Sequence, residues 1–296
     1  MRFRLVAYIA LAVWLGLTAS SFVVSAELLP YANPVASTGL RFLLACVLML
    51  PFVLGRLTLL TVELGFKYLL ISLFLVLFFL GLFKSLQTTT ALRTSVIYTL
   101  LPLLTVLVSY CALRMRPSAM QVVGFLMGSS GAVWSLLASN GGDSALWIWY
   151  SGDSIFLLSC LSLALHVVLI KKWLGDIDPV QNVFMILLVG GALLCPFVLG
   201  YGELKNVGWT SASFWSVFLY LTCFTTIGTF LLQQYLLKYF SPSHLLAVSY
   251  LIPFCVLLPD AMSHMDRLYY ALPGFILTAI AIPIIFGVDW KLSFKS

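Results

Sequence analysis

The sequence predicts an all-α membrane protein whose ten transmembrane helices form two inverted repeats of five helices each. The first observation is composition: 62% of the residues are hydrophobic and 9% are charged, whereas about a quarter of a soluble domain is charged. The second is that apolar runs of about 20 residues, each long enough to cross a bilayer core, recur along the chain. The third is an internal sequence repeat, which indicates a duplicated chain.

Three short patterns occur once in each half of the chain and in the same order. The pairs are residues 33–35 with 178–180, 51–55 with 196–200, and 86–102 with 237–253. The middle pair is identical, PFVLG in both halves. In the last pair, Arg93 and His244 each stand nine residues before a proline, Pro102 and Pro253. Matches at three ordered places indicate duplication.

The ten predicted spans cover residues 5–25, 34–54, 65–85, 91–112, 118–138, 153–172, 180–200, 212–236, 243–262 and 269–288. The first run is too long for the apolar region of a signal peptide, and no small-residue cleavage site follows it. We therefore interpret it as a transmembrane helix. Asn33 and Asp178 are suited to cap the helices that start at the prolines after them.

Between the two halves lies a polar, glycine-rich segment with Trp147, Trp149 and Tyr150, which are typical anchors at a membrane interface. The predicted parts are a first repeat at 1–138, a periplasmic linker at 139–151, a second repeat at 152–290 and a cytoplasmic tail at 291–296.

Lysine and arginine positions predict the orientation of the chain. With the N-terminus inside, eleven of these residues fall at cytoplasmic helix ends and four, Lys84, Arg93, Lys205 and Arg267, at the other side. This bias places both termini in the cytoplasm. Because each half holds an odd number of spans, the second half must enter the membrane from the opposite side. Inverted repeats are a recurrent plan of secondary transporters, with the ligand site near the midplane.

Four motifs keep a fixed order along nearly the whole chain. They are Gly39-Leu40-Arg41-Phe42, the segment 85–95 followed by Pro102, Gly152-Asp153, and Asp266-Arg267-Leu268. Together they resemble the EamA-like branch of the drug/metabolite transporter superfamily: its LRF motif, its ALxYTSAxxAS…P signature, the GD that opens its second unit, and its Glu-Arg-Leu. Met115 departs from the acidic residue usual in the first half, and Trp14-Leu15-Gly16 departs from WGS.

The resemblance implies a ten-helix transporter, commonly an exporter of amino acids or other small metabolites. It does not select the substrate, because the superfamily also handles sugars, nucleotide sugars and cationic drugs.

Two polar side chains are predicted inside the membrane. Arg41 lies in the second span, where a charge needs a partner or a water-filled cavity. One interpretation is a guanidinium that extends to the interface or bonds a helix-end carbonyl, and the other is a substrate contact. His166 lies about halfway along the sixth span. It is either a packing residue or a cavity group that bonds a carboxylate or exchanges a proton.

Pro102 and Pro253, which occupy the same place in the two repeats, predict a second group of substrate contacts. A proline inside a helix loosens the preceding turn, and interrupted helices are tolerated in membranes where they line a cavity. Tyr98, Ser249 and Tyr250 lie just before these prolines and are predicted to contact the substrate, as are Trp14 and Gln234.

The same segments supply the predicted moving parts. Pro102 and Pro253 are the expected hinges, and Arg93 and His244 the expected gating residues. Lys84 and Arg93 are either hydrated helix ends or a cationic vestibule. In either case, Glu27 and Asp260 are the carboxylates expected to neutralise them.

The remaining patterns indicate packing and exclude other classes. Gly124, Gly128 and Gly131 form a small-residue stripe that predicts close helix packing, within the chain or across a dimer, and we favour the former. The six cysteines fall in apolar runs without CxxC spacing. No catalytic motif, metal-ligand cluster or P-loop occurs, so we expect no enzyme, cofactor, metal or ATP motor. The scattered basic residues give no nucleic-acid patch.

We therefore expect a secondary transporter in the inner membrane of a bacterial cell. The leading function is export of small polar metabolites, such as amino acids or related zwitterions and anions, by alternating access. The alternatives are uptake of a nutrient or osmolyte by the same fold, or a passive pore or scaffold subunit. Proton coupling, exchange and uniport remain open, as do a monomer and a homodimer.

Overall fold

The computed structural model describes residues 2–56, 61–139, 149–261 and 265–289, and every regular element in these ranges is a helix. Eight helical spans are long and apolar enough to cross a membrane, and two shorter apolar helices, at 119–134 and 242–257, bring the number in the described residues to ten. The predicted all-helical architecture is confirmed. Most of the predicted linker (140–148), His264, Lys291 and Lys295 lie outside the described residues.

The first repeat contains α1 (Arg2–Leu28), α2 (Pro34–Val53), α3 (Val62–Leu86), α4 (Ala91–Tyr98), α5 (Leu101–Leu113) and α6 (Ala119–Ser139). The second repeat contains α7 (Ser151–Trp173), α8 (Pro179–Tyr201), η2 (Leu204–Asn206), α9 (Ala212–Tyr220), η3 (Leu221–Gly228), α10 (Thr229–Leu236), α11 (Pro242–Ala247), η4 (Val248–Leu251), α12 (Ile252–Ala261) and α13 (Met265–Asp289).

The start of α2 forms as the sequence predicts, and the start of α8 forms differently. Asn33 accepts a hydrogen bond from the Val35 backbone N–H at 2.9 Å, and Pro34 opens the helix. Asp178 occupies the corresponding position before α8, but its side chain makes no capping hydrogen bond. It lies instead 3.6 Å from the guanidinium of Arg56, across the repeat boundary.

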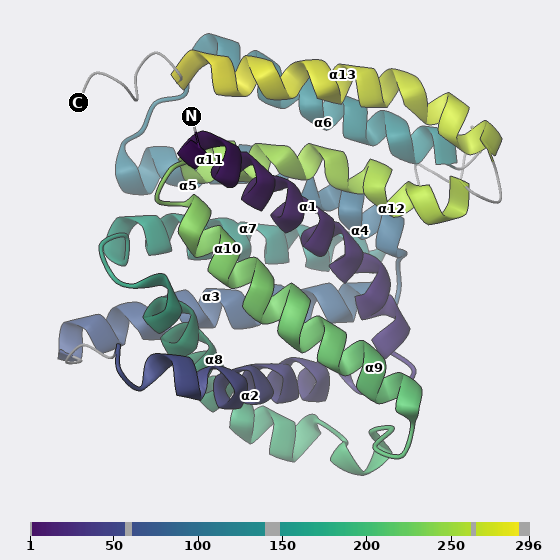
Figure 1. The fold of residues 1–296 in the computed structure, drawn as a ribbon. Coiled ribbons are helices and arrows are strands. Elements are labelled where there is room, and N and C mark those ends of the chain that lie inside the picture. Colours follow the sequence, from purple (N-terminus) through teal and green to yellow (C-terminus); the bar gives the residue numbers. More distant parts are fainter. Residues whose placement is uncertain (1, 57–60, 140–148, 262–264, 290–296) are drawn as a thin grey trace.

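Helices of one repeat pack mainly on helices of the other. Figure 1 shows α6 and α13 side by side along one edge of the bundle, α2 and α8 near the opposite edge, and α3 beside α7 between them. α1 and α10 cross the face of this layered bundle at an angle to the other helices. Since each main contact joins the two repeats, neither repeat forms a separate core.

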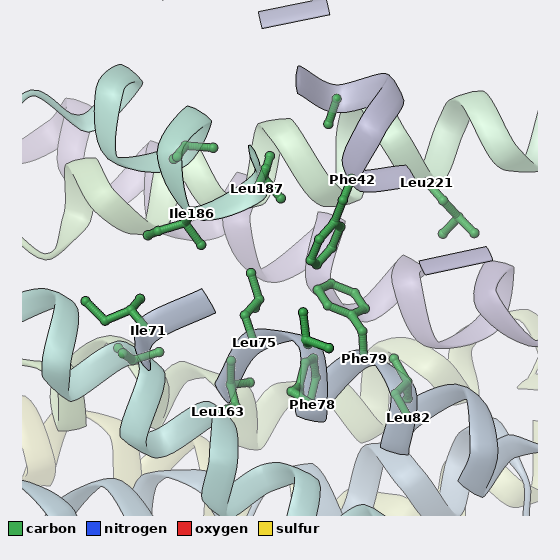
Figure 2. Close-up of a cluster of buried hydrophobic side chains, with 14 of the residues drawn as sticks. Phe42, Ile71, Leu75, Phe78, Phe79, Leu82, Leu163, Ile186, Leu187 and Leu221 are labelled. Carbon is green, nitrogen blue, oxygen red and sulfur yellow. The ribbon is translucent and has the colours of Figure 1, made fainter. Parts of the chain in front are cut away.

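The interior between α2, α3, α7 and α8 is filled by interlocking apolar side chains. Figure 2 shows the rings of Phe42 and Phe79 facing each other, and their centroids are 5.5 Å apart at 87°. Within a bilayer, such packing and buried polar bonds hold helices together, because lipid is as apolar as the side chains. The bond from the Ser72 hydroxyl to the Ile186 carbonyl, at 2.9 Å, is one of these.

The small-residue stripe of α6 packs within the chain, as favoured from the sequence. A Cβ added at Gly131 would lie 2.5 Å from the Gly274 carbonyl oxygen in α13, and one added at Gly274 would lie 2.5 Å from the Gly131 oxygen. The two backbones are therefore in direct contact. Gly128 faces the ring of Tyr250, and Gly124 faces Ile285.

Three spans are interrupted near mid-length. The fourth span was predicted as one helix, but α4 ends at Tyr98 and α5 begins at Leu101, with Pro102 in its first turn. The ninth span changes to a 3₁₀ segment, η4, before Pro253. The eighth span contains a π-helical segment, η3, which the sequence analysis did not predict. Breaks before both repeat prolines agree with the reasoning that selected them, while their role as hinges stays a prediction.

The close approach of α6 and α13 predicts a steric limit at Gly131. Gly131→Ala should lower the free energy of unfolding by about 1–3 kcal/mol, since its methyl group must push backbone atoms apart. Gly16→Ala is the matched control, because nothing lies within 4 Å of a Cβ at that position. Thermal unfolding in detergent measures both; equal midpoints for the two variants would contradict the close packing described here.

Candidate functional site

A cavity lies between the repeats. About 520 Å³ in and around it is not occupied by atoms, a volume that includes open solvent at its mouth. Its lining comes from α1, α2, α3, α4, α7, η3 and α10, so both repeats contribute. The aromatic part of the lining consists of Trp14, Phe22, Phe78, Phe79, Tyr98 and Phe230. The uncharged polar part consists of Thr18, Ser21, Ser25, Thr225, Thr229 and Gln233. Arg41 is the charged residue among the described lining residues.

Arg41 is buried, with 1% of its surface exposed, and its guanidinium is held from the other repeat. Nη2 donates to the hydroxyl oxygens of Thr226 at 2.7 Å and Thr225 at 3.3 Å, and to the carbonyl oxygen of Leu221 at 3.4 Å. Arg41 therefore does not extend to the interface. Its side chain ties α2 to the interrupted eighth span.

The π-helical segment explains why two adjacent threonines reach the same group. Thr225 and Thr226 both donate to the Leu221 carbonyl oxygen at 2.9 Å, four and five residues back along the chain. A regular α-helix would direct only the first of these hydroxyls to that carbonyl. Short π segments often occur at functional sites. The sequence shows four threonines in this apolar span, at 222, 225, 226 and 229, which indicates polar groups inside the membrane but not the π geometry.

Two phenylalanine rings cover the rest of the guanidinium. The central carbon of Arg41 lies 5.0 Å from the ring centroid of Phe79 and 5.8 Å from that of Phe83, distances typical of cation–π contacts. Among the described residues, Nε and Nη1 of Arg41 have no hydrogen-bond acceptor. The cavity thus contains a fixed positive charge whose donors are only partly used.

The predicted substrate contacts divide into two groups. Trp14, Arg41 and Tyr98 lie together on the cavity. The ring of Tyr98 packs edge-on against Phe22, at 5.1 Å between centroids. At the end of the eighth span, the structure places Gln233 on the cavity where the sequence analysis chose its neighbour, Gln234.

The other predicted contacts lie behind the cavity wall. His166 bonds the Ile71 carbonyl through Nδ1 at 2.9 Å and packs against Phe230, which itself lines the cavity. Tyr250 packs against Gly128 and accepts a hydrogen bond from Ser129 at 3.4 Å. Ser249 is fully buried in the ninth span. These positions show packing roles, and any substrate contact by these residues requires another conformation.

Arg93, one of the predicted gating residues, joins the fourth span to the start of the second repeat. Its Nη2 lies 2.5 Å from Oδ2 of the fully buried Asp153, and Thr89 donates to the other carboxylate oxygen at 3.0 Å. The same carboxylate accepts from the Tyr150 backbone N–H at 3.0 Å, which caps α7. The structure shows Asp153 as a partner of Arg93, a residue that the sequence analysis did not choose for this role; neutralisation by Glu27 and Asp260 stays a prediction. Asp260 and Arg267 belong to segments whose side chains the structure does not describe.

Lys84 lies near this cluster in the sequence but makes a separate contact. It donates to the Gln87 side chain at 3.0 Å, and Glu27 is exposed near the end of α1. The sequence analysis combined Lys84 and Arg93 in a cationic vestibule. In the structure, Asp153 neutralises the charge of Arg93.

His244, the other predicted gating residue, occupies a comparable place in the second repeat. Its Nε2 lies 3.1 Å from the Ile285 carbonyl oxygen and 3.3 Å from the Gln121 amide nitrogen, and its Nδ1 contacts the Ser241 hydroxyl. This group connects α11 with α6 and α13. Among the described residues, no three His, Cys, Asp or Glu side chains are placed to hold a metal ion.

The buried carboxylate predicts a strong effect on stability. Asp153→Ala should lower the free energy of unfolding by about 3 kcal/mol or more, because it leaves the Arg93 guanidinium largely buried without its counter-charge. Glu63→Ala removes a carboxylate that is 78% exposed and paired with Lys67, and it should change little. Thermal unfolding compares the two variants; a similar small effect at both positions would show that the Arg93–Asp153 pair adds little to stability.

Comparison with known proteins follows the two-repeat organisation. The sequence model of the EamA-like transporter family matches residues 5–137 and 150–287. The chain is 25% identical over 236 residues to "Uncharacterized transporter YetK" of Bacillus subtilis (strain 168), covering 76% of this chain and 70% of that protein. It also has the fold of a protein of known crystal structure, with a TM-score of 0.71, 17% identity, and 99% and 98% of the two chains covered.

The family matches account for most of the chain in two successive units. The family is one of membrane transporters and not of enzymes. The protein therefore belongs to the EamA-like transporter family of the drug/metabolite transporter superfamily, as a multi-pass membrane transporter built from two EamA repeats.

Proposed function

We propose that this transporter exports small polar metabolites, such as amino acids or related zwitterions and anions, across the cytoplasmic membrane of a bacterial cell. The observation that supports this most directly is the cavity between the repeats, which combines hydroxyl and amide groups with the buried Arg41 guanidinium. Sites built from both repeats, near the membrane midplane, are typical of transporters with inverted repeats.

Alternating access is supported by the positions of the two polar clusters. The Arg93–Asp153 cluster lies toward one end of the bundle, at the starts of α4 and α7, and the His244–Gln121 cluster lies toward the other end, at the starts of α11 and α6 (Figure 1). We propose that these clusters close the two entrances in turn. The interrupted fourth and ninth spans would absorb the movement at Pro102 and Pro253.

The proposed orientation places both termini in the cytoplasm, because most lysine and arginine residues then lie on the cytoplasmic side. The Arg93–Asp153 cluster would then lie on the periplasmic side. We propose that transport is coupled either to protons or to an exchanged solute. The buried His166 stands one side chain behind the cavity wall and is the proposed proton-exchanging group if coupling is to protons.

Transport in proteoliposomes tests the proposal. Vesicles preloaded with an unlabelled solute should accumulate the labelled one by counterflow, with saturable kinetics, for at least one compound in a panel of amino acids, organic acids and sugars. Flux that rises without saturation would indicate the passive pore instead. Repeating the assay with an imposed pH gradient separates proton coupling from exchange, and efflux from loaded cells separates export from uptake.

Substitution of the two repeat tyrosines tests the position of the site. Tyr98→Ala should weaken solute affinity by about tenfold, because it removes an aromatic wall of the cavity. Tyr250→Ala should act mainly on thermal stability, because its ring fills the space beside Gly128. Binding isotherms and unfolding midpoints measured on both variants check this. A loss of affinity confined to Tyr250→Ala would place the substrate elsewhere.

A further inference from the structure

We propose that the cavity selects organic monoanions: a single carboxylate bound by Arg41, on a compact apolar or aromatic body, in preference to a zwitterion of the same shape. This inference rests on the proposed function, because it assigns a substrate class to the cavity described there. It depends on charge balance, on the unused donors of Arg41 and on the apolar character of much of the cavity lining.

Charge balance within the cavity favours an anion. Arg41 is the charged group among the described lining residues, and the ion pairs of the described residues, formed by Arg56, Lys67 and Arg93, do not include it. A buried unpaired charge is unfavourable in a membrane protein. A monocarboxylate makes the filled cavity neutral. A zwitterion also supplies a carboxylate, but its ammonium group introduces a second buried positive charge with no carboxylate among the described lining residues.

Two buried nitrogen atoms of Arg41 have no acceptor in the described part of the chain, and a carboxylate reaches them once the Phe79 or Phe83 ring moves aside. The guanidinium has five N–H groups. Nη2 is held by Thr225, Thr226 and the Leu221 carbonyl, while Nε and Nη1 have no acceptor in the described part of the chain. A carboxylate accepts charge-assisted hydrogen bonds from such donors. The two threonines give their own protons to Leu221, so they orient the guanidinium and are positioning residues.

Much of the cavity lining is suited to an apolar body. Trp14, Phe22, Phe78 and Tyr98 present aromatic surface, and Leu163 adds an aliphatic side chain. Two lining hydroxyls of α1 are already used as donors within their helix: Thr18 donates to the Trp14 carbonyl at 2.7 Å and Ser21 to the Thr18 carbonyl at 2.6 Å.

A set of four probes with one phenyl body isolates the charge. They are 3-phenylpropanoate (anion), phenylalanine (zwitterion), 3-phenylpropanamide (neutral) and 2-phenylethylamine (cation). Binding to the full-length protein in lipid nanodiscs at pH 7 is measured by titration calorimetry. The wild type should bind the anion at least about tenfold more tightly than the zwitterion, which corresponds to about 1.4 kcal/mol, and the amide and the amine more weakly still.

Variants assign this preference to Arg41. Arg41→Gln should abolish the preference for 3-phenylpropanoate over its amide. Arg41→Lys should keep part of it, because the charge stays but the fork of donors is lost. Thr226→Val should reduce the anion-to-amide ratio by a few-fold, an effect that loss of packing alone would not produce. Arg56→Gln is the matched control and should change none of the ratios, since Arg56 lies outside the cavity.

Several outcomes would overturn the proposal. These are equal or tighter binding of phenylalanine than of 3-phenylpropanoate, an unchanged anion-to-amide ratio in Arg41→Gln, or no binding of any probe to the wild type. If Arg41→Gln fails to fold, Arg41→Lys and Thr226→Val decide the question by the same ratio. Counterflow of other solutes alongside a failed probe set would leave the transport function standing. Arg41-dependent anion binding without saturable flux would remove the transport function and leave this inference.

Discussion

The burial of the Arg41 guanidinium is the interaction on which the organisation of the site depends. A positive charge within a lipid-embedded bundle needs polar partners, and the protein supplies them from the opposite repeat. The eighth span changes to π geometry at that level, so that Thr225 and Thr226 face the guanidinium together. Phe79 packs on the other side of the charge and also against Phe42 and Phe230. The charged group, the irregular helix and the apolar core are thus one connected structure.

The pairing of equivalent helices gives this structure its rigid frame. α2 packs on α8 and α6 on α13, each helix against the one at the same place in the other repeat. At Gly131 and Gly274 the contact is backbone to backbone. Some of the spans that line the cavity are in contrast interrupted, as at η3, or tilted, as Figure 1 shows for α1 and α10. The bundle thus combines closely packed outer pairs with irregular spans beside the cavity.

Sequence reasoning reached the architecture because lipid imposes simple rules. Span length, the duplicated prolines and the GxxxG stripe depend on local composition, and the structure agrees with them. Three of the residues chosen from the sequence, Trp14, Arg41 and Tyr98, line the cavity, because a charge within a span and an aromatic residue before a proline can be recognised in a sequence. Their contact with a substrate stays a prediction. His166 and Tyr250 look equally suitable in the sequence, but which face of a helix points inward depends on its rotation in the bundle. The π segment was missed because it depends on one backbone irregularity that residue types do not encode strongly.

Because of the π segment, the eighth span holds more residues than a regular α-helix of the same length. A π turn accommodates extra backbone compared with an α-helix, and each residue in an α-helix turns the chain by about 100°. Deleting a single residue within 221–228 would remove that extra backbone, so the span could become a regular α-helix while the turns on either side keep nearly their present rotation. In a regular helix only one of two adjacent hydroxyls points at a given carbonyl, so Thr225 and Thr226 would no longer face the Arg41 guanidinium together. A deletion in the eighth span, unlike one in a loop, would therefore change the surroundings of the buried Arg41 guanidinium.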